Sequence, residues 1–408
     1  MARKQINIEE LVPGMYIDEI VCGIRERSRI GETKNFIITS KNEISLIAKQ
    51  GIRTLYIDPD KSEIYPDEVD EGRNKAELTR LKNEAPQEPK SLEDELYEAR
   101  TILRKTSTAL ENAFNDARSG NKIKTEPLKP LLEDIFNSVS GNKDAIVTVC
   151  RKKSKNGYAL EHAVSHAALM MAFGQTMEMD KETLIDFGLG SLFIDIGNIR
   201  IPNSILKKPA KLTPEELEIV KKHTLFGAEI MIDAGTFPEK AISIVMEHHE
   251  RYDGTGYPYQ LAGNDISLAG QMASIADVYD ASISIRPYGI AGDPCQVIKN
   301  LYKEAGKQFQ MDMVQQFIKT IGIYPVGTLA RLESDKLGIV IKQTKNLTRP
   351  IVRIVYDLRH NCYLPPKDTD LSRVSGKGDK VIEAESPEKW KIDPFRFIFP
   401  EMAANRDE

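Results

Sequence analysis

One short stretch, residues 248–258, restricts what this chain can fold into more than any other. It reads His-His-Glu-Arg-Tyr-Asp-Gly-Thr-Gly-Tyr-Pro, so two imidazoles and two carboxylates lead into a glycine-rich turn. Burying such groups without partners is unfavourable, whereas imidazoles and carboxylates together bind metal ions that activate water. The chain has 6 histidines, and five of them lie between positions 162 and 249. The sequence therefore predicts a metal site, and a metal-dependent phosphoesterase is the leading hypothesis.

Composition narrows the class of protein. A chain of 408 residues should hold two or three domains, because single cores stop growing at about 250–300 residues. A net charge of −5 argues against a DNA-binding or membrane-surface protein, which would need a basic patch. The four cysteines lie far apart, as is typical of reduced thiols. Without an apolar run of about 18 residues, no membrane insertion is expected, and we predict a cytoplasmic protein.

The periodicity of apolar residues predicts a mainly α fold with two smaller β-containing parts. Short alternating runs near the N-terminus, with turn signals such as Pro13-Gly14, are typical of a small β-rich or α/β domain. Apolar residues then recur every three or four positions up to Phe317, as on amphipathic helices, and strand-like runs follow Ile323. The expected parts are a β-rich N-terminal domain (1–60), a charged linker (61–92), a helical connector (93–155), a metal-binding helical domain (156–322) and a C-terminal β extension with a tail (323–408).

Helical spacing places His and Asp side chains on inward faces. His248 falls on a stripe with Ala241, Ile244 and Val245, which are spaced as on the buried side of a helix. A carboxylate on such a face is rarely buried without a partner. The same reasoning gives the other inward candidates, which are His162, Asp195, His223 and Asp277.

Simpler interpretations apply to some of these residues. A single inward histidine is more often a hydrogen-bonded core residue than a ligand, and we assign His166 to that class. His360 follows Asp357 in a polar turn and is expected at the surface. The capping box that begins at Thr213 predicts a helix that carries His223.

The candidate ligands occur with a specific order, spacing and flanking sequence. The segments concerned are His162, Asp195, His223, His248-His249, Gly254-Thr-Gly-Tyr-Pro258, Ile275-Ala-Asp-Val-Tyr-Asp280 and the run from Ile201 to Thr213. Together they resemble the HD-GYP family of bacterial cyclic di-GMP phosphodiesterases over residues 158–323. The segments on either side resemble a subgroup of that family with an N-terminal domain of unknown role. The resemblance implies an HD-type helical bundle for the core.

The resemblance also implies a two-metal site that cleaves a cyclic dinucleotide, cyclic di-GMP or a relative such as 3′3′-cGAMP. The implied ligands are His162, Asp195 and Asp277 for one ion, and Asp195, His223, His248 and His249 for the other, with Asp195 also in the catalytic role. Arg286 would hold a substrate phosphate, since guanidinium suits bidentate contacts. The implied partner surface, linked in the family to diguanylate cyclases, comprises Gly254, Gly256, Tyr257 and Pro258.

The chain departs from the family pattern at several positions, three of which bear on metal and phosphate binding. Ile194 stands where the family has a ligand histidine, Asn198 where it has a phosphate-binding lysine, and Gly289 where it has a second basic residue. Loss of one preorganised donor slows a reaction by roughly 10²–10³. We therefore predict a weak or inactive hydrolase with one divalent ion rather than two, iron or manganese rather than zinc or magnesium. Three alternatives stay open: a non-catalytic module that binds a cyclic dinucleotide or a signalling protein, a fully active phosphodiesterase, and a hydrolase of an unrelated phosphate ester.

Overall fold

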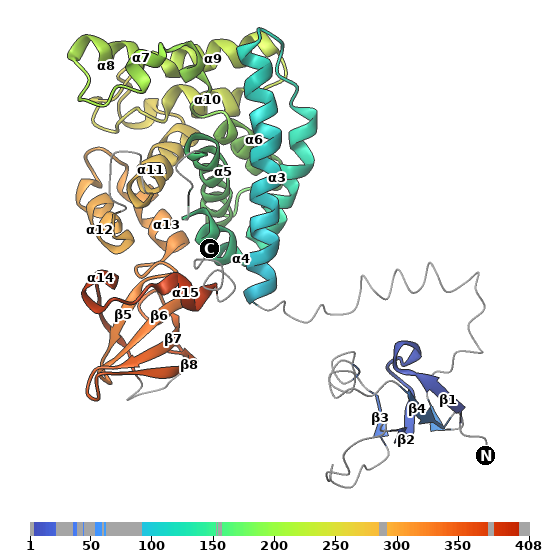
Figure 1. Cartoon of the computed structure of the whole chain (residues 1–408). Coiled ribbons are helices and arrows are strands. Elements are labelled where there is room, and N and C mark those ends of the chain that lie inside the picture. The colour runs from blue at the N-terminus through green and yellow to red at the C-terminus, as the bar shows by residue number, and fades with distance from the viewer. Residues whose placement is uncertain are drawn as a thin grey trace. The chain divides into compact units, whose positions relative to one another are not determined.

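The computed structural model describes residues 4–21, 36–38, 44, 54–58, 61–62, 92–151, 153, 157–284, 292–373 and 379–399. The chain divides into two compact units, residues 1–89 and residues 90–408. The first contains a small sheet, and the second combines a helical core with another sheet (Figure 1). This confirms the predicted mainly α fold with two β-containing parts. No helix in the described ranges has the length and apolar character needed to cross a membrane.

The N-terminal unit is built on a four-stranded antiparallel sheet in the order β1-β4-β2-β3. Its strands are β1 (Lys4–Asn7), β2 (Tyr16–Val21), β3 (Phe36–Ile37) and β4 (Thr54–Ile57), and the short helix η1 (Ile8–Glu10) follows β1. Leu55 and Ile57 are fully buried, because every second side chain of a strand lies on the same face. Ile6 and Ile17 on neighbouring strands complete this core.

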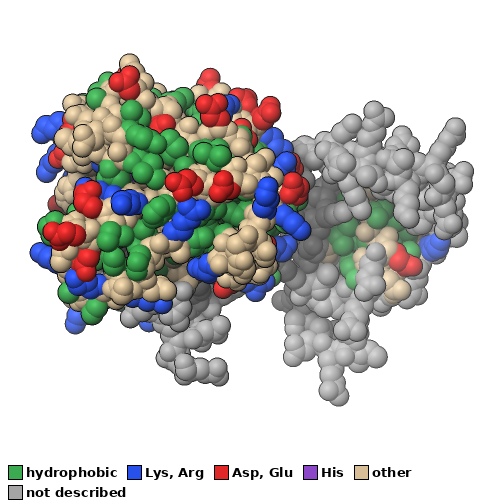
Figure 2. All heavy atoms as spheres, turned by 90° about the horizontal axis from the view of Figure 1, so that it is seen from above, with side chains coloured by type: hydrophobic (Ala, Val, Ile, Leu, Met, Phe, Trp, Pro, Cys, Tyr) green, Lys and Arg blue, Asp and Glu red, His purple; other side chains and the backbone are tan. Residues whose placement is uncertain are grey.

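Helices make up most of the larger unit (Figure 1). They are α3 (Leu92–Arg118), η4 (Glu126–Leu128), α4 (Lys129–Cys150), α5 (Tyr158–Thr176), α6 (Lys181–Leu192), η5 (Ile196–Arg200), α7 (Asn203–Leu206), α8 (Pro214–Lys221), α9 (His223–Ala234), α10 (Glu239–Glu247), η6 (Gly263–Asp265), α11 (Leu268–Ile283), α12 (Pro294–Glu304) and α13 (Met311–Ile321). The end with α7, α8 and α9 lies opposite the sheet of this unit. On the face seen in Figure 2, basic, acidic and apolar side chains are interspersed over the helical unit.

Two apolar clusters hold these helices together. In the first, α3 and α4 pack against α5 and α6, with Leu132 and Leu192 fully buried. In the second, α11 and α13 pack against α5 around Phe173, Tyr279 and Phe317. Helix α5 belongs to both clusters, and residues 162–174 on it are all buried. Polar side chains on this part of α5 therefore need partners inside the protein.

The C-terminal part is a five-stranded antiparallel sheet in the order β8-β7-β6-β5-β9. Its elements are β5 (Leu329–Leu332), β6 (Lys336–Lys342), β7 (Ile351–Asp357), β8 (Cys362–Asp370) and β9 (Val381–Ala384), followed by α14 (Pro387–Trp390) and α15 (Pro394–Ile398). The sequence predicted β5, β6 and β7. It missed β8, an exposed edge strand that contains Pro365 and Pro366 and therefore shows no apolar alternation.

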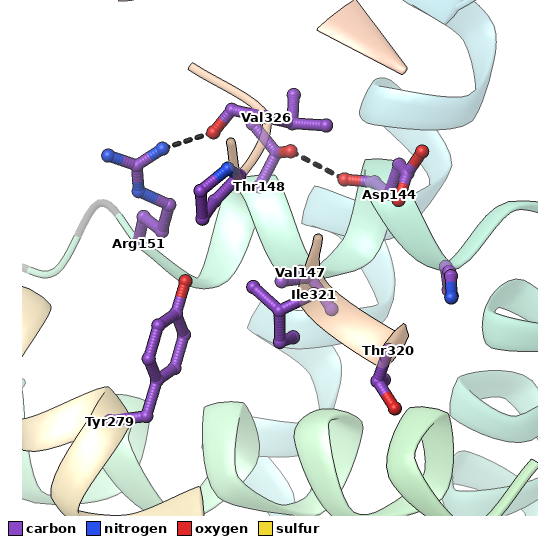
Figure 3. Close-up of a pocket in the computed structure, with 10 residues that line it drawn as sticks. Asp144, Val147, Thr148, Arg151, Tyr279, Thr320, Ile321 and Val326 are labelled. Carbon is purple, nitrogen blue, oxygen red and sulfur yellow. Dashed lines mark hydrogen bonds between the residues drawn. The ribbon is translucent and has the colours of Figure 1, made fainter. Parts of the chain in front are cut away.

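Arg151, just after α4, joins the helical core to this sheet (Figure 3). Its guanidinium donates a hydrogen bond to the carbonyl oxygen of Val326 and lies 5.3 Å from the centroid of the Phe395 ring. Asp144 on α4 accepts the backbone N–H of Gln343 at 2.6 Å. The sheet is therefore fixed to α4 by polar contacts as well as by apolar packing.

Candidate metal centre

His248 and His249 follow directly on α10. The stripe of Ala241, Ile244 and Val245 is fully buried, as its spacing predicted, and His248 continues it with 1% exposure. Nδ1 of His248 lies 2.9 Å from the carbonyl oxygen of Val245. A carbonyl oxygen only accepts, so Nδ1 carries the proton and Nε2 keeps a free lone pair.

His223 is the first residue of α9. The capping box at Thr213 begins α8 as predicted, but α8 ends at Lys221. The expectation that one helix continues to His223 was wrong, because the backbone tightens at Lys222, whose N–H bonds to the carbonyl oxygen three residues earlier. Nδ1 of His223 lies 2.8 Å from the carbonyl oxygen of Val220. Nε2 of His223 therefore also keeps its lone pair.

These side chains converge in what we call the three-histidine cluster, formed by His223, His248 and His249. Nε2 of His223 and Nε2 of His248 are 3.3 Å apart. One donor atom from each of the three histidines lies within 4.8 Å of the others, and no other group of His, Cys, Asp or Glu in the described ranges does the same. Facing lone pairs repel each other unless a cation lies between them. The donor set therefore fits one transition-metal ion.

Burial keeps two members of the three-histidine cluster, His248 and His249, in the neutral form. Burial and the neighbouring imidazoles hold the pKa of His248 well below its ordinary value. Burial likewise lowers the pKa of His249 to about 4. Metal ions bind the neutral imidazole, so near pH 7 no proton has to leave these two side chains before an ion binds.

Asp195 lies beside the cluster, between α6 and η5. Its Oδ1 is 3.6 Å from Nε2 of His223 and accepts a hydrogen bond from the amide of Asn198 at 3.1 Å. Ile194, the residue before it, is fully buried and has no donor atom. The resemblance implies an imidazole at position 194 and an ammonium group at position 198. The chain has an aliphatic side chain, Ile194, at the first and a neutral amide, Asn198, at the second.

A second group, which we call the His162–Asp277 pair, joins α5 to α11. Nε2 of His162 lies 3.2 Å from Oδ1 of Asp277, and Nδ1 lies 2.6 Å from Oδ2 of Asp280. Burial alone would lower the pKa of His162, but its hydrogen bonds with the two carboxylates raise it to about 10. His162 is therefore an imidazolium that donates from both nitrogens.

Lys153 completes this second group. Its ammonium pairs with Oδ2 of Asp280, and only 1% of each side chain is exposed. Burial would raise the pKa of Asp280, but Lys153 and His162 lower it. In the sequence, Asp280 was identified as the end of the run that begins at Ile275 and was given no role, and Lys153 belongs to a basic run that carries no site signal. Asp280 is a positioning residue, because it fixes which nitrogen of His162 points toward Asp277.

The glycine-rich turn packs over the three-histidine cluster. The Tyr257 ring stacks on His249, with ring centroids 4.7 Å apart. Gly254 has a φ of +76°, and a Cβ on Gly256 would lie 2.5 Å from the backbone of Glu250, so both positions require glycine. The carboxylate of Glu250 accepts backbone N–H groups of the turn at 2.7 and 3.0 Å. The ring of Tyr257, predicted as part of a partner surface with Pro258, thus contacts the three-histidine cluster.

The remaining candidates differ in their surroundings. His166 is fully buried, and its Nε2 lies 3.1 Å from the carbonyl oxygen of Ala273. The side chain of His360 is 76% exposed beside Asp357, as predicted. Arg286 and Gly289, predicted to hold a phosphate and to lack a basic group, lie outside the described residues.

Comparison with known proteins gives matches over almost the whole chain. Residues 150–313 match a family model described as HD domain, and residues 3–128 match a model described as domain of unknown function (DUF3391). A cyclic di-GMP phosphodiesterase of Pseudomonas aeruginosa is 31% identical over 392 residues, covering 95% of this chain and 94% of that protein.

Two further relatives match this chain over shorter lengths. The cyclic di-GMP phosphodiesterase response regulator RpfG of Xanthomonas campestris is 34% identical over 157 residues, which cover 38% of this chain and 41% of RpfG. A 3′3′-cGAMP-specific phosphodiesterase of Vibrio cholerae is 36% identical over 126 residues, which cover 31% of this chain and 24% of that protein. All three relatives are named for hydrolysis of a cyclic dinucleotide.

Proposed function

Because this chain belongs to the HD-GYP family of cyclic di-GMP phosphodiesterases, we propose that it binds a cyclic dinucleotide and hydrolyses it slowly with a divalent metal ion. The observation that carries the proposal is the contrast between a convergent three-histidine cluster and a fully buried Ile194 beside Asp195. Cyclic di-GMP is the first candidate substrate. The match to a 3′3′-cGAMP-specific enzyme makes 3′3′-cGAMP the second.

The three-histidine cluster and Asp195 would hold the tightly bound ion. Imidazole favours transition metals and carboxylate favours harder ions, so the mixed set supports iron or manganese. A bound ion would activate water and stabilise charge on the phosphate. Tyr257 covers one side of His249 and limits the access of bulk water there. Asp195 remains the residue proposed to link both halves of the site, since its Oδ1 already lies near His223.

Slow turnover follows from the two replaced groups. The site has lost an imidazole at Ile194 and an ammonium at Asn198, and each preorganised donor is worth roughly 10²–10³ in rate. The second candidate function, a non-catalytic module that binds a cyclic dinucleotide or a partner protein, is favoured by these same two replacements. The slow hydrolase and the non-catalytic module are both expected to bind a cyclic dinucleotide, but only the hydrolase should cleave it.

Turnover and metal content of the purified chain test the proposal. We expect about one iron or manganese ion per chain by elemental analysis, measurable binding of cyclic di-GMP or 3′3′-cGAMP, and slow cleavage that stops on chelation. An Asp195→Asn variant provides the blank. Binding without any metal-dependent cleavage supports the second candidate. If neither nucleotide is bound, both candidates are wrong, and cleavage at a rate typical of the family would contradict the proposed impairment.

A further inference from the structure

His166 lies on α5 four residues after His162, on the same face of the helix. Two histidines with this spacing on one helix can bind the same metal ion, as in helical H-x-x-x-H motifs. His166 is fully buried. The ring centroids of His162 and His166 are 6.2 Å apart.

The hydrogen bonding of His166 defines its tautomer. Nε2 faces the carbonyl oxygen of Ala273, which only accepts, so Nε2 carries the proton. Nδ1 keeps the lone pair, yet it is buried and has no hydrogen-bond partner in the part of the chain that the structure describes. An unsatisfied buried acceptor destabilises a fold by about 1–3 kcal/mol. A neutral imidazole whose other nitrogen donates to a backbone carbonyl is also the usual arrangement of a metal ligand.

His166 lies within electrostatic range of both groups of candidate ligands. Its charge would interact with those of Asp277 and His162 in one group and with that of His248 in the other. Ile194 is buried and has no donor atom. The free lone pair of His166 is therefore, among the described residues, a buried imidazole donor that can replace the missing one.

We propose that Nδ1 of His166 is the third protein ligand of a second divalent metal ion, together with His162 and Asp277. This inference rests on the metal site of the proposed function and adds a weaker ion to the tight one. Within the described ranges only the three-histidine cluster already has its donors within 4.8 Å, so the second set must adjust its side chains to close around an ion. Lower affinity than at the cluster follows.

A His166→Gln variant tests the proposal. The Gln amide N–H can still donate to the carbonyl oxygen of Ala273, while the Nδ1 lone pair is lost, so the core contact is kept and the ligand is removed. In a Mn²⁺ titration followed by equilibrium dialysis, the unmodified chain should bind one ion tightly and a second weakly. In the variant, the second ion should bind at least 10-fold more weakly, with the tight ion unchanged. Equal binding of the second ion by both proteins would overturn the proposal.

Two further measurements do not depend on the stability of that variant. In the unmodified chain labelled with nitrogen-15, the Nδ1 resonance of His166 should shift on addition of the second equivalent of Zn²⁺, and an unshifted resonance argues against ligation. Ile194→His added to His166→Gln should restore the second ion through the family's own ligand. These readouts are independent of turnover, so a chain that binds the second ion through His166 without hydrolysing cyclic di-GMP would refute the proposed function alone.

Discussion

The three-histidine cluster and the His162–Asp277 pair use the same residue types in opposite electrostatic states. In the cluster, burial keeps His248 and His249 neutral, and the Nε2 atoms of His223 and His248 lie 3.3 Å apart. In the pair, His162 is charged and lies between Asp277 and Asp280. One group therefore offers lone pairs that a cation would satisfy, whereas the other already contains a cation.

The difference arises from the carboxylates rather than from the histidines. Asp277 and Asp280 are balanced by His162 and Lys153, so this buried group is neutral as it stands. An incoming metal ion must replace a proton held with a pKa of about 10. The cluster has no such competing proton on His248 or His249. A family site that lacks one ligand should therefore lose the ion of the His162–Asp277 pair first.

The largest effect is expected from removing the cluster. His248→Ala combined with His249→Ala deletes two of three imidazole ligands, so the tightly bound ion should be lost completely. Metal content measured by elemental analysis should fall from about one ion per chain to background, and the melting temperature should fall with it. His360→Ala, which removes an exposed histidine, is the matched control. Unchanged metal content in the double variant would show that these residues are not ligands.

The next effect concerns the replaced positions. Ile194→His with Asn198→Lys supplies the two groups that the family resemblance implies, next to an Asp195 that is already in place. Cyclic di-GMP hydrolysis should rise by roughly 10² or more, taking one donor as the lower limit. Ile194→Val, which preserves an apolar side chain, is the control for altered packing. If the double variant binds two ions and stays inert, the block lies elsewhere in the site.

The sequence was most informative where a ligand follows from periodicity. The stripe of Ala241, Ile244 and Val245 predicted the inward direction of His248, and the resemblance grouped it with His223 and His249. The prediction that the helix beginning at Thr213 carries His223 was wrong, because a capping box fixes where a helix begins but carries no information on where it ends.

The residues that pair with the candidate metal ligands could not be predicted from the sequence. Lys153 lies more than 100 positions from Asp280, and only the packing of α5 against α11 brings the two together. The free lone pair of His166 likewise depends on the position of the Ala273 carbonyl oxygen on another helix. Long-range hydrogen bonds of this kind form only in the packed core, and helical periodicity does not predict which distant residues meet there.

A smaller effect on metal affinity should follow from replacing Asp280, which accepts a hydrogen bond from His162. Asp280→Asn keeps the size of the side chain but weakens acceptance of the Nδ1–H, which should lower the affinity of the pair for its ion by about 10–100-fold. The measurement is a Mn²⁺ titration in the Ile194→His background, where the family's ligand set is complete. The affinity of the three-histidine cluster should not change, and an equal loss at both ions would indicate general unfolding.

Lys153→Met is the companion variant. It leaves the buried Asp280 and Asp277 with one cation, His162, in place of two, and breaking a buried ion pair destabilises a protein by about 3–5 kcal/mol. Lys153→Met combined with Asp280→Asn removes both charges and should recover most of the lost free energy of unfolding in urea. A double variant as unstable as Lys153→Met would show that Lys153 acts through something other than Asp280.

The smallest effect is the pH dependence of stability after chelation of metal. The pKa values of His166 and His249 are lowered to about 4 by burial, so between pH 6.5 and 4 the unfolded chain binds protons that the folded chain does not. Stability should therefore fall as the pH drops from 6.5 through 4. His162 has the opposite sign: its pKa is raised to about 10, so its contribution is complete below pH 6.5 and is lost as the pH rises through 10.

In the curve of stability against pH, His166 and His249 therefore determine the acid limb and His162 the alkaline limb. The chelated protein should be most stable near pH 6.5 and should lose at most about 1.4 kcal/mol per pH unit for each histidine that titrates. Urea unfolding between pH 4.5 and 9.5 measures both limbs. His166→Gln should make the acid limb shallower and leave the alkaline limb unchanged, because one of the buried neutral imidazoles is removed and His249 remains. His162→Gln should change the alkaline limb instead. If the two variants change the same limb, the contrast between a neutral His166 and a charged His162 does not hold in solution.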